Sequence, residues 1–295
     1  MLCICEKLGR RGFNVISQVR RFSRNNREID RNIDRLCVEF RKLEGGSVDI
    51  SKDEESGIAT VTMCNSGKKN AFTGKMMVDL LDCVTELEQW TAGKGVVLTG
   101  ADNSFCSGGD LETVKRVLGN GYGMCELMQH TTSRLFDLPM VSCAAISGHA
   151  LGGGAELATA CDFRIMSKEA KIGFVQARLN VATGWGGCTR LAKIVGRTTA
   201  LQVLASARVL DANTARTLGL VNDVLDTDNI ATEAMDWLSK NCIGDVNVTR
   251  VIKQMVVAGL YFEESQSYDM EKQLFCKVWG SRSHKDALEA NIKHK

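Results

Sequence analysis

A run of glycines followed by a glutamate, Gly152-Gly153-Gly154-Ala155-Glu156, is the segment of this sequence best suited to chemistry. It follows an apolar stretch and opens a predicted helix, so its backbone N–H groups lie at a helix N-terminus, where the helix dipole favours negative charge. Three glycines let a ligand approach the backbone closely, because no Cβ is in the way. The segment predicts an anion site with a carboxylate in the first helical turn. The alternative left open is a tight turn in which Glu156 only complements the dipole.

A second glycine-bearing turn, Ser107-Gly108-Gly109-Asp110, lies ahead of another predicted helix. Two such turns in one domain can each point a backbone N–H at the same atom. Two donors aimed at one carbonyl oxygen form an oxyanion hole, which stabilises the negative charge that develops there during a reaction. The two turns together favour chemistry on a carbonyl compound, with Glu156 as the nearest group able to transfer a proton.

The elements that must position these turns follow an alternation of strands and helices. Alternating or continuous apolar runs predict strands at 58–63, 95–100, 141–146, 163–166 and 171–174. Apolar positions at helical spacing predict helices at 76–90, with Thr73 as a possible N-cap, at 122–138, at 189–195 and in six stretches from residue 198 to residue 292. Repeated strand–helix units followed by helices indicate an α/β core with a helical C-terminal part.

Composition divides the chain into three parts. Residues 1–45 are rich in arginine and are expected to lie outside the core. Their first part is basic, poor in acids and carries an apolar stripe, which is typical of a mitochondrial transit peptide. A disordered basic extension is the alternative left open. Residues 46–197 are predicted to form the core that carries both glycine turns, and residues 198–295 are predicted to form a helical region.

Bulk composition argues against several classes of protein. The chain has 295 residues, of which 44% are hydrophobic, so it is long enough to bury a full core. A formal net charge of +2 gives no reason to expect nucleic acid or a membrane surface as a partner. The 12 cysteines are scattered without metal-ligand spacing, so they are interpreted as reduced core residues, and no metal is expected. Every apolar run is interrupted before it reaches the length of a membrane span.

Four motifs of the sequence resemble the crotonase, or enoyl-CoA hydratase/isomerase, superfamily. They are Asn65 with Asn70-Ala71-Phe72, Phe105-Cys106-Ser107-Gly108-Gly109-Asp110-Leu111, Gly148 with Leu151-Gly152-Gly153-Gly154-Ala155-Glu156-Leu157 and Cys161-Asp162, and Gly184-Trp185-Gly186-Gly187 with Arg190-Leu191. Each motif is weak alone, but four in this order are specific. The resemblance covers roughly residues 50–290. It implies a crotonase-like spiral of ββα units, a coenzyme A thioester as ligand, and a homotrimer or a hexamer assembled through the C-terminal helices.

The resemblance also implies roles for single residues. The two oxyanion donors of the superfamily fall on the backbone N–H groups of Gly109 and Gly153, and its first catalytic glutamate falls on Glu156. The residues expected to contact the acyl-CoA substrate are Lys68, Ser107, Gly108, Gln176, Gly184 and Trp185. The loop of Lys68 lies near the coenzyme A phosphates in the superfamily, and a merely solvated lysine is the alternative. A core position is the alternative for Trp185.

Gln176 departs from the pattern of the hydratases, which carry their second catalytic glutamate at this position. Adding water across a double bond requires one group to activate the water and another to handle the α-proton. A carboxamide cannot transfer a proton at neutral pH. The sequence therefore disfavours a hydratase.

Within the superfamily, residues 86–91, 160–166 and 185–191 look most like enzymes that decarboxylate 2-alkylmalonyl-CoA thioesters, ethylmalonyl-CoA and also methylmalonyl-CoA. The resemblance thus implies a carboxy-lyase of metabolite repair. No cofactor is expected, because the thioester carbonyl itself accepts the electrons that remain when CO₂ leaves, and coenzyme A is part of the substrate. The alternatives are another acyl-CoA reaction, such as isomerisation or hydration, and a non-catalytic relative that binds RNA.

Two features of the sequence favour different compartments. The resemblance implies the cytosol, which is the expected location. The arginine-rich residues near the N-terminus favour the mitochondrial matrix, which remains the alternative.

Overall fold

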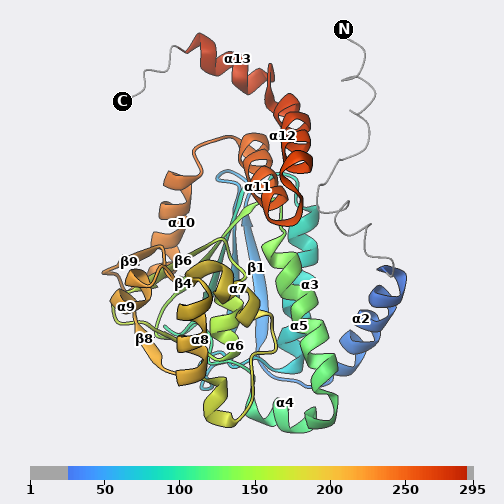
Figure 1. Cartoon of the computed structure of the whole chain (residues 1–295), viewed down its shortest axis with the longest axis vertical. Coiled ribbons are helices and arrows are strands. Elements are labelled where there is room, and N and C mark those ends of the chain that lie inside the picture. The colour runs from blue at the N-terminus through green and yellow to red at the C-terminus, as the bar shows by residue number, and fades with distance from the viewer. Residues whose placement is uncertain (1–25, 291–295) are drawn as a thin grey trace. The chain divides into compact units, whose positions relative to one another are not determined.

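The computed structural model of the protein describes residues 26–290, and these residues fall into two compact units. One unit comprises residues 31–242, and the other contains residues 243–290. The predicted transit peptide, or basic extension, lies for the most part in residues 1–25, outside the described residues. Figure 1 labels the helices and strands as they are named below.

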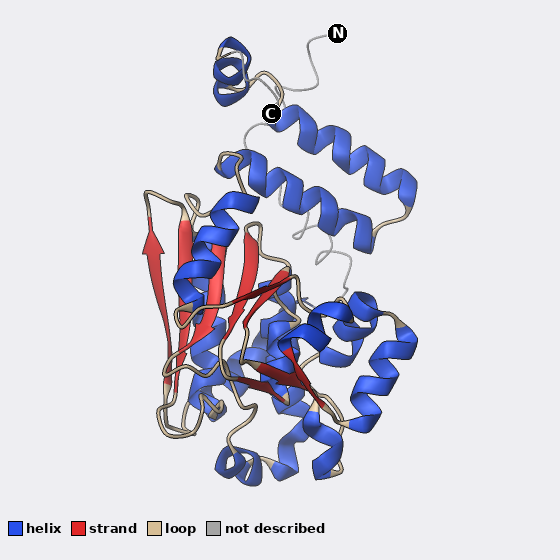
Figure 2. Cartoon of the chain, turned by 90° about the vertical axis from the view of Figure 1, so that its left-hand side faces the viewer, coloured by secondary structure: helices blue, strands red, loops and turns tan. Residues whose placement is uncertain are grey.

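A six-stranded, mostly parallel sheet forms the centre of the unit of residues 31–242. Its strands are β1 (Ser47–Asp53), β2 (Ile58–Cys64), β3 (Gly95–Gly100), β4 (Val141–Ile146), β6 (Phe163–Ser167) and β9 (Asp223–Leu225). They are ordered β1-β2-β3-β4-β6-β9, and only the pair of β1 and β2 is antiparallel. Figure 2 shows these strands lying side by side. The α/β class expected from the sequence is confirmed.

The central strands are apolar on both faces, as parallel strands covered on two sides must be. Along β4, Ala144 and Ile146 pack into the larger hydrophobic cluster of the molecule. Cys143 and Ala145, which alternate with them, pack into a smaller cluster on the opposite face. The sheet therefore separates two apolar layers.

Helices cover both faces of the sheet. Helix α3 (Gly74–Gln89) and helix α5 (Gly121–Phe136) contribute to the larger cluster and run side by side, cyan and green in Figure 1. The other face is covered by α10 (Ile230–Asn241), which buries Ile230, Ala234 and Leu238 against the strands. Thr73 caps α3 as predicted, since its side chain accepts a hydrogen bond from Met76 N.

A smaller sheet carries the central glycine motif. Its strands β5 (His149–Leu151), β7 (Lys171–Gly173) and β8 (Val209–Asp211) are ordered β5-β7-β8. The remaining elements of this unit are α4 (Leu111–Arg116), η1 (Leu118–Asn120), α6 (Gly153–Ala158), η2 (Val175–Leu179), α7 (Gly187–Val195), α8 (Arg197–Ser206) and α9 (Ala212–Thr217). The sequence predicts that the strand at 141–146 leads through glycines directly to the helix. The structure places the additional short strand β5 between them, and only Gly152 separates β5 from α6.

Helix α2 (Asn26–Phe40) corrects the expectation that residues 1–45 lie outside the core. Its Ile33, Leu36 and Phe40 are buried within the larger hydrophobic cluster. Arg31 and Arg35 are exposed on the remaining surface of the helix. Charge dominates the composition of this segment, but three apolar side chains at helical spacing suffice to bury one face.

The predicted boundary at residue 198 is also wrong. Strands β8 and β9 pair with strands of the core, and α10 packs on the main sheet, so the first unit continues to residue 242. The purely helical part is shorter than predicted and consists of α11 (Val246–Tyr261), α12 (Glu264–Val278) and α13 (Arg282–Glu289). Helices α11 and α12 pack around a small cluster of their own, formed by Val251, Ala258, Met270 and Leu274. Among residues 26–290, no helix is both long and apolar enough to cross a membrane.

Candidate active site

Backbone hydrogen bonds hold the two glycine turns beside each other. The segment that precedes Gly109 pairs with β5, because Cys106 N donates to His149 O over 2.8 Å and Leu151 N donates to Cys106 O over 2.9 Å. On its other side, Phe72 N donates to Gly108 O over 2.8 Å. The first turn is thereby fixed against the start of α6.

Glycine is required where the two turns meet. Gly108 has a φ of +104°, and a Cβ there would lie 3.1 Å from Leu151 O and 3.2 Å from Gly153 N. A Cβ on Gly154 would lie only 2.1 Å from Cys106 O. Gly152 caps α6 with a φ of +55°, which side chains rarely allow. The close approach of the turns therefore depends on the absence of side chains.

Gly109 and Gly153 leave their backbone donors available. Among the described residues, neither N–H donates a hydrogen bond, and both glycines are partly exposed. Both border the ring of Trp185, because a Cβ would lie 2.6 Å from this ring at Gly153 and 4.0 Å from it at Gly109. Their N–H groups were predicted as a pair of donors, and the structure brings the two residues to the same side chain.

Glu156 is a buried and extensively hydrogen-bonded side chain. It is 2% exposed, and both of its carboxylate oxygens accept N–H bonds. Gln176 Nε2 (2.8 Å) and Gly184 N (3.2 Å) donate to Oε1, whereas Trp185 N (2.8 Å) and Gly187 N (2.9 Å) donate to Oε2. The predicted residues Gln176, Gly184 and Trp185 therefore surround the predicted catalytic glutamate.

Two opposing effects set the pKa of Glu156. Burial is the larger effect and raises the pKa, because desolvation disfavours the charged carboxylate. The four N–H donors oppose it, since they stabilise the ionised form. The balance leaves the pKa above its ordinary value. A buried carboxyl of this kind can act as an acid nearer to neutral pH than an exposed one.

Trp185 is both a core residue and a site residue, so the two readings of the sequence do not exclude each other. Its side chain is 3% exposed, and its ring centroid lies 5.8 Å from that of Phe72. Its backbone N–H contacts Glu156 while its ring borders Gly109 and Gly153. The residue thus forms one wall between the acid and the two donors.

Arg190 was not predicted as a site residue, although it lies just beyond the Gly184–Gly187 motif. Its Nη2 donates to Trp185 O over 2.6 Å and to Glu156 O over 3.2 Å, and its Nε donates to Thr159 Oγ1 over 3.0 Å. Its Nη1 also reaches Thr132 Oγ1 on α5. The loop of residues 184–187 donates hydrogen bonds to Glu156. The guanidinium of Arg190 connects this loop to α5 and to α6. The family motif included Arg190, but no role was assigned to it from the sequence.

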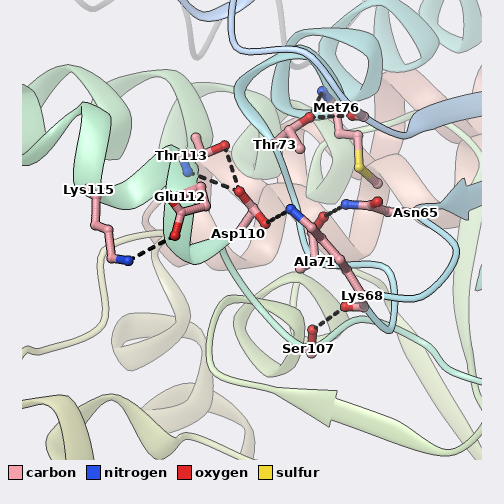
Figure 3. Close-up of polar contacts among 11 residues, drawn as sticks. Asn65, Lys68, Ala71, Thr73, Met76, Ser107, Asp110, Glu112, Thr113 and Lys115 are labelled. Atoms are coloured by element: carbon pink, nitrogen blue, oxygen red, sulfur yellow. Dashed lines mark hydrogen bonds and ion pairs between the residues drawn. The ribbon is translucent and has the colours of Figure 1, made fainter.

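Lys68 and Ser107 form a second group, joined by a hydrogen bond from Ser107 Oγ to Lys68 O of 3.0 Å. Lys68 Nζ lies 2.7 Å from Asp110 Oδ2, as Figure 3 shows. Asp110 caps α4 by accepting from Thr113 N. Burial raises the pKa of Asp110, but the bonds from Lys68 and Thr113 outweigh it and leave the pKa lowered.

A cavity of about 330 Å³ adjoins the Lys68–Asp110 pair. Its lining residues are Lys42, Leu43, Glu44, Lys68, Asp110, Glu112, Thr113 and Arg116. Lys68 is therefore neither simply solvated nor next to Glu156: its ammonium is ion-paired at the edge of a charged cavity. Within residues 26–290, no group of histidine, cysteine or acidic side chains could hold a metal ion.

Comparisons with known proteins agree with this architecture. Residues 53–294 match the family profile described as enoyl-CoA hydratase/isomerase. The chain is 42% identical to an ethylmalonyl-CoA decarboxylase of Gallus gallus over 92% of both chains, and 43% identical to that of Homo sapiens over 84% of this chain and 82% of the relative. An enoyl-CoA hydratase structure from Bacillus anthracis superposes with a TM-score of 0.75 at 26% identity, covering 84% of this chain and 95% of that one. A similarity of this extent, together with the glycine turns around Glu156, places the chain in the enoyl-CoA hydratase/isomerase family.

Proposed function

We propose that the protein decarboxylates 2-alkylmalonyl-CoA thioesters, with ethylmalonyl-CoA as the principal substrate and methylmalonyl-CoA as a second one. The proposal is supported by the relatives of more than 40% identity that are named ethylmalonyl-CoA decarboxylases. The observation that carries it in the site is the pairing of a single buried carboxyl, Glu156, with the carboxamide of Gln176. Such a pair can deliver one proton but cannot supply the two proton-transfer groups of a hydratase.

The first step breaks the bond between C2 and the carboxyl carbon. The electron pair of that bond moves toward the thioester, whose carbonyl oxygen becomes an enolate oxygen, and CO₂ leaves. The backbone N–H groups of Gly109 and Gly153 donate to this oxygen. Each donor of such a pair contributes about 2.7–4 kcal/mol to transition-state stabilisation in comparable sites. The reaction needs no cofactor, because the thioester is the electron sink.

The second step returns a proton to C2. Glu156 enters the reaction as the neutral acid, which its raised pKa favours, and a neutral acid does not repel the substrate carboxylate. It gives its proton to C2, which yields butyryl-CoA from ethylmalonyl-CoA. The resulting carboxylate is held by its four N–H donors until water returns a proton.

The remaining part of the substrate is assigned to the first glycine turn and the lysine beside it. Ser107 and Gly108 line the path of the thioester, and Lys68 exchanges its contact with Asp110 for a phosphate of coenzyme A. Support comes from the position of Lys68 at the charged cavity, where its side chain is about half exposed.

Isomerisation of an enoyl-CoA is the second candidate reaction. The observation that favours it is the same single carboxyl, because one glutamate beside an oxyanion hole can move a proton from one carbon of the acyl chain to another. Product analysis separates the two. A decarboxylase converts ethylmalonyl-CoA to butyryl-CoA, which carries one deuterium at C2 when the reaction is run in D₂O. An isomerase leaves ethylmalonyl-CoA unchanged and shifts the double bond of an enoyl-CoA.

We further propose that the protein acts as a homotrimer, or as a hexamer of two trimers, in metabolite repair in the cytosol. Support for assembly comes from large apolar side chains that are exposed on α11, α12 and α13 and at the C-cap of α12: Val256, Leu260, Tyr268, Phe275, Trp279 and Leu288. Imaging of the full-length chain fused at its C-terminus to a fluorescent protein tests the compartment, and signal confined to mitochondria would favour the matrix instead.

A further inference from the structure

The nitrogen of the Gln176 carboxamide makes a hydrogen bond, but its oxygen makes none among the described residues. Its Nε2 donates to Glu156 Oε1 over 2.8 Å, whereas its Oε1 is buried and has no hydrogen-bond partner among the described residues. A buried acceptor without a partner is unusual in a folded protein, because the group has lost its water without compensation. A polar atom left in this state next to the proposed acid calls for a functional reason.

The protonation state of Glu156 decides which way this amide must point. Three of the donors to Glu156 are backbone N–H groups, of Gly184, Trp185 and Gly187, and their direction is fixed by the loop. A protonated Glu156 acquires an O–H and needs an acceptor, which none of these three groups provides. Rotation of the Gln176 amide by half a turn brings its Oε1 to that O–H. The same rotation turns Nε2 away from Glu156.

We propose that Gln176 is the specificity-determining residue for a substrate carboxylate, and that its amide reverses with the protonation of Glu156. This inference rests on the proposed decarboxylase function. With Glu156 ionised, the amide presents an oxygen and the site carries a negative charge, so a carboxylate is repelled. With Glu156 protonated, the amide presents its NH₂ group, which donates to the carboxylate of the substrate. Protonation of Glu156 therefore has two effects: it provides the proton that C2 receives in the second step, and it allows the carboxylate of the substrate to bind.

Other titratable groups near Glu156 do not share this behaviour. Cys125 lies on α5, and both burial and the negative charge of Glu156 raise the pKa of its thiol, which stays neutral. Arg190 on α7 donates to Glu156 O and to Trp185 O, and a guanidinium keeps its charge throughout the neutral range. Glu156 is therefore the group of this set whose charge changes.

Two unreactive thioethers of coenzyme A test the inference by calorimetry. S-(2-Carboxybutyl)-CoA carries the substrate carboxylate but lacks the carbonyl that would accept electrons, and S-butyl-CoA lacks the carboxylate as well. For the wild-type protein, the affinity for the carboxylate ligand should fall by up to about tenfold per pH unit above the pKa of Glu156, because one proton is taken up on binding. The affinity for S-butyl-CoA should not follow pH in this way.

Variants of Gln176 isolate the amide from the acid. Gln176→Met, which keeps the length of the side chain, should weaken binding of the carboxylate ligand by about tenfold and leave S-butyl-CoA nearly unaffected, since only a charge-assisted hydrogen bond is lost. Gln176→Glu should abolish binding of the carboxylate ligand but not of S-butyl-CoA. Gln89→Glu, the same change at an exposed position at the end of α3, is the control and should change neither affinity.

The inference is overturned if Gln176→Met weakens both ligands equally, or if the wild-type affinity for the carboxylate ligand does not depend on pH. Retained binding of S-butyl-CoA shows that each variant is folded. Release of CO₂ from ethylmalonyl-CoA by the wild-type protein tests the proposed function separately. The decarboxylation can proceed without a reversing amide, so CO₂ release would support the proposed function even if the inference about Gln176 is wrong.

Discussion

In the proposed reaction, Glu156 is neutral when the substrate arrives and charged after it has given up its proton. Its surroundings serve both states, because burial favours the neutral acid while four N–H donors stabilise the carboxylate. Replacing it with glutamine keeps the shape of the side chain and removes the proton. We expect Glu156→Gln to lower the rate of product formation by about 10²–10⁴-fold, the usual contribution of a general acid.

The control for this substitution is Glu55→Gln, because Glu55 is exposed in the turn between β1 and β2 and belongs to neither the site of Glu156 nor the cavity beside Lys68. Both variants are assayed for butyryl-CoA formed from ethylmalonyl-CoA. Activity of Glu156→Gln close to that of the control would show that Glu156 only orients the thioester or stabilises the helix.

The pH dependence of activity and of stability follows from the raised pKa of Glu156. The neutral acid is lost as pH rises through this pKa, so kcat/KM should fall on the alkaline side of it. The folded-state pKa lies above the unfolded value, so the stabilisation is complete below the unfolded pKa and is lost as pH rises through the folded one. Glu156→Gln should flatten both dependences. Profiles of kcat/KM and of the free energy of unfolding check this, and identical slopes in the two proteins would contradict it.

The sequence could predict the types of residue at the site but not all their contacts. Gly109, Gly153 and Glu156 could be predicted because glycine turns before helices leave N–H groups unsatisfied, and the family resemblance singled out these positions. The orphaned oxygen of Gln176 depends on how η2 is placed against α6, two elements separated by strands β6 and β7. Arg190 was missed because its role arises from acceptors on three separate elements.

At the scale of elements, the fit between the first glycine turn and α6 tolerates no added atom. A Cβ on Gly154 would lie 2.1 Å from Cys106 O. We expect Gly154→Ala to lower the free energy of unfolding by about 1–3 kcal/mol, the usual cost of forcing extra volume into a packed interior, and to reduce activity. Gly121→Ala at the start of α5 is the matched control, because nothing lies within 4 Å of its added Cβ. The free energy of unfolding of both variants is measured by denaturant titration. An equal loss in the two variants would contradict the tight packing at Gly154.

Long periodic elements could be predicted from the sequence, and short ones could not. Helices α3 and α5 and strands β3 and β4 follow clear apolar patterns. Strands β8 and β9 have three residues each, too few to show a period of two, and they form because β7 and β6 offer free edges. Their pairing extends the core to residue 242. Helix α2 was misjudged because its composition is dominated by charge while its apolar stripe is narrow.

At the scale of the whole molecule, we expect the proposed trimer or hexamer in solution. Val256 and Leu260 are exposed on α11, and contact between copies would remove them from water. Analytical ultracentrifugation of the full chain should give three or six times the mass of one chain. Leu260→Glu should shift the protein toward smaller species, because a charge would be buried at the contact. A single-chain mass for the wild-type protein at every concentration would contradict assembly.

CO₂ release from ethylmalonyl-CoA by the purified protein tests the proposed decarboxylation directly, with methylmalonyl-CoA and crotonyl-CoA assayed in parallel. We expect CO₂ from ethylmalonyl-CoA, a slower release from methylmalonyl-CoA, and no hydration of crotonyl-CoA, because Gln176 cannot activate water. Hydration of crotonyl-CoA without CO₂ release would contradict it. A second carboxylate would then have to complete the site beside Glu156.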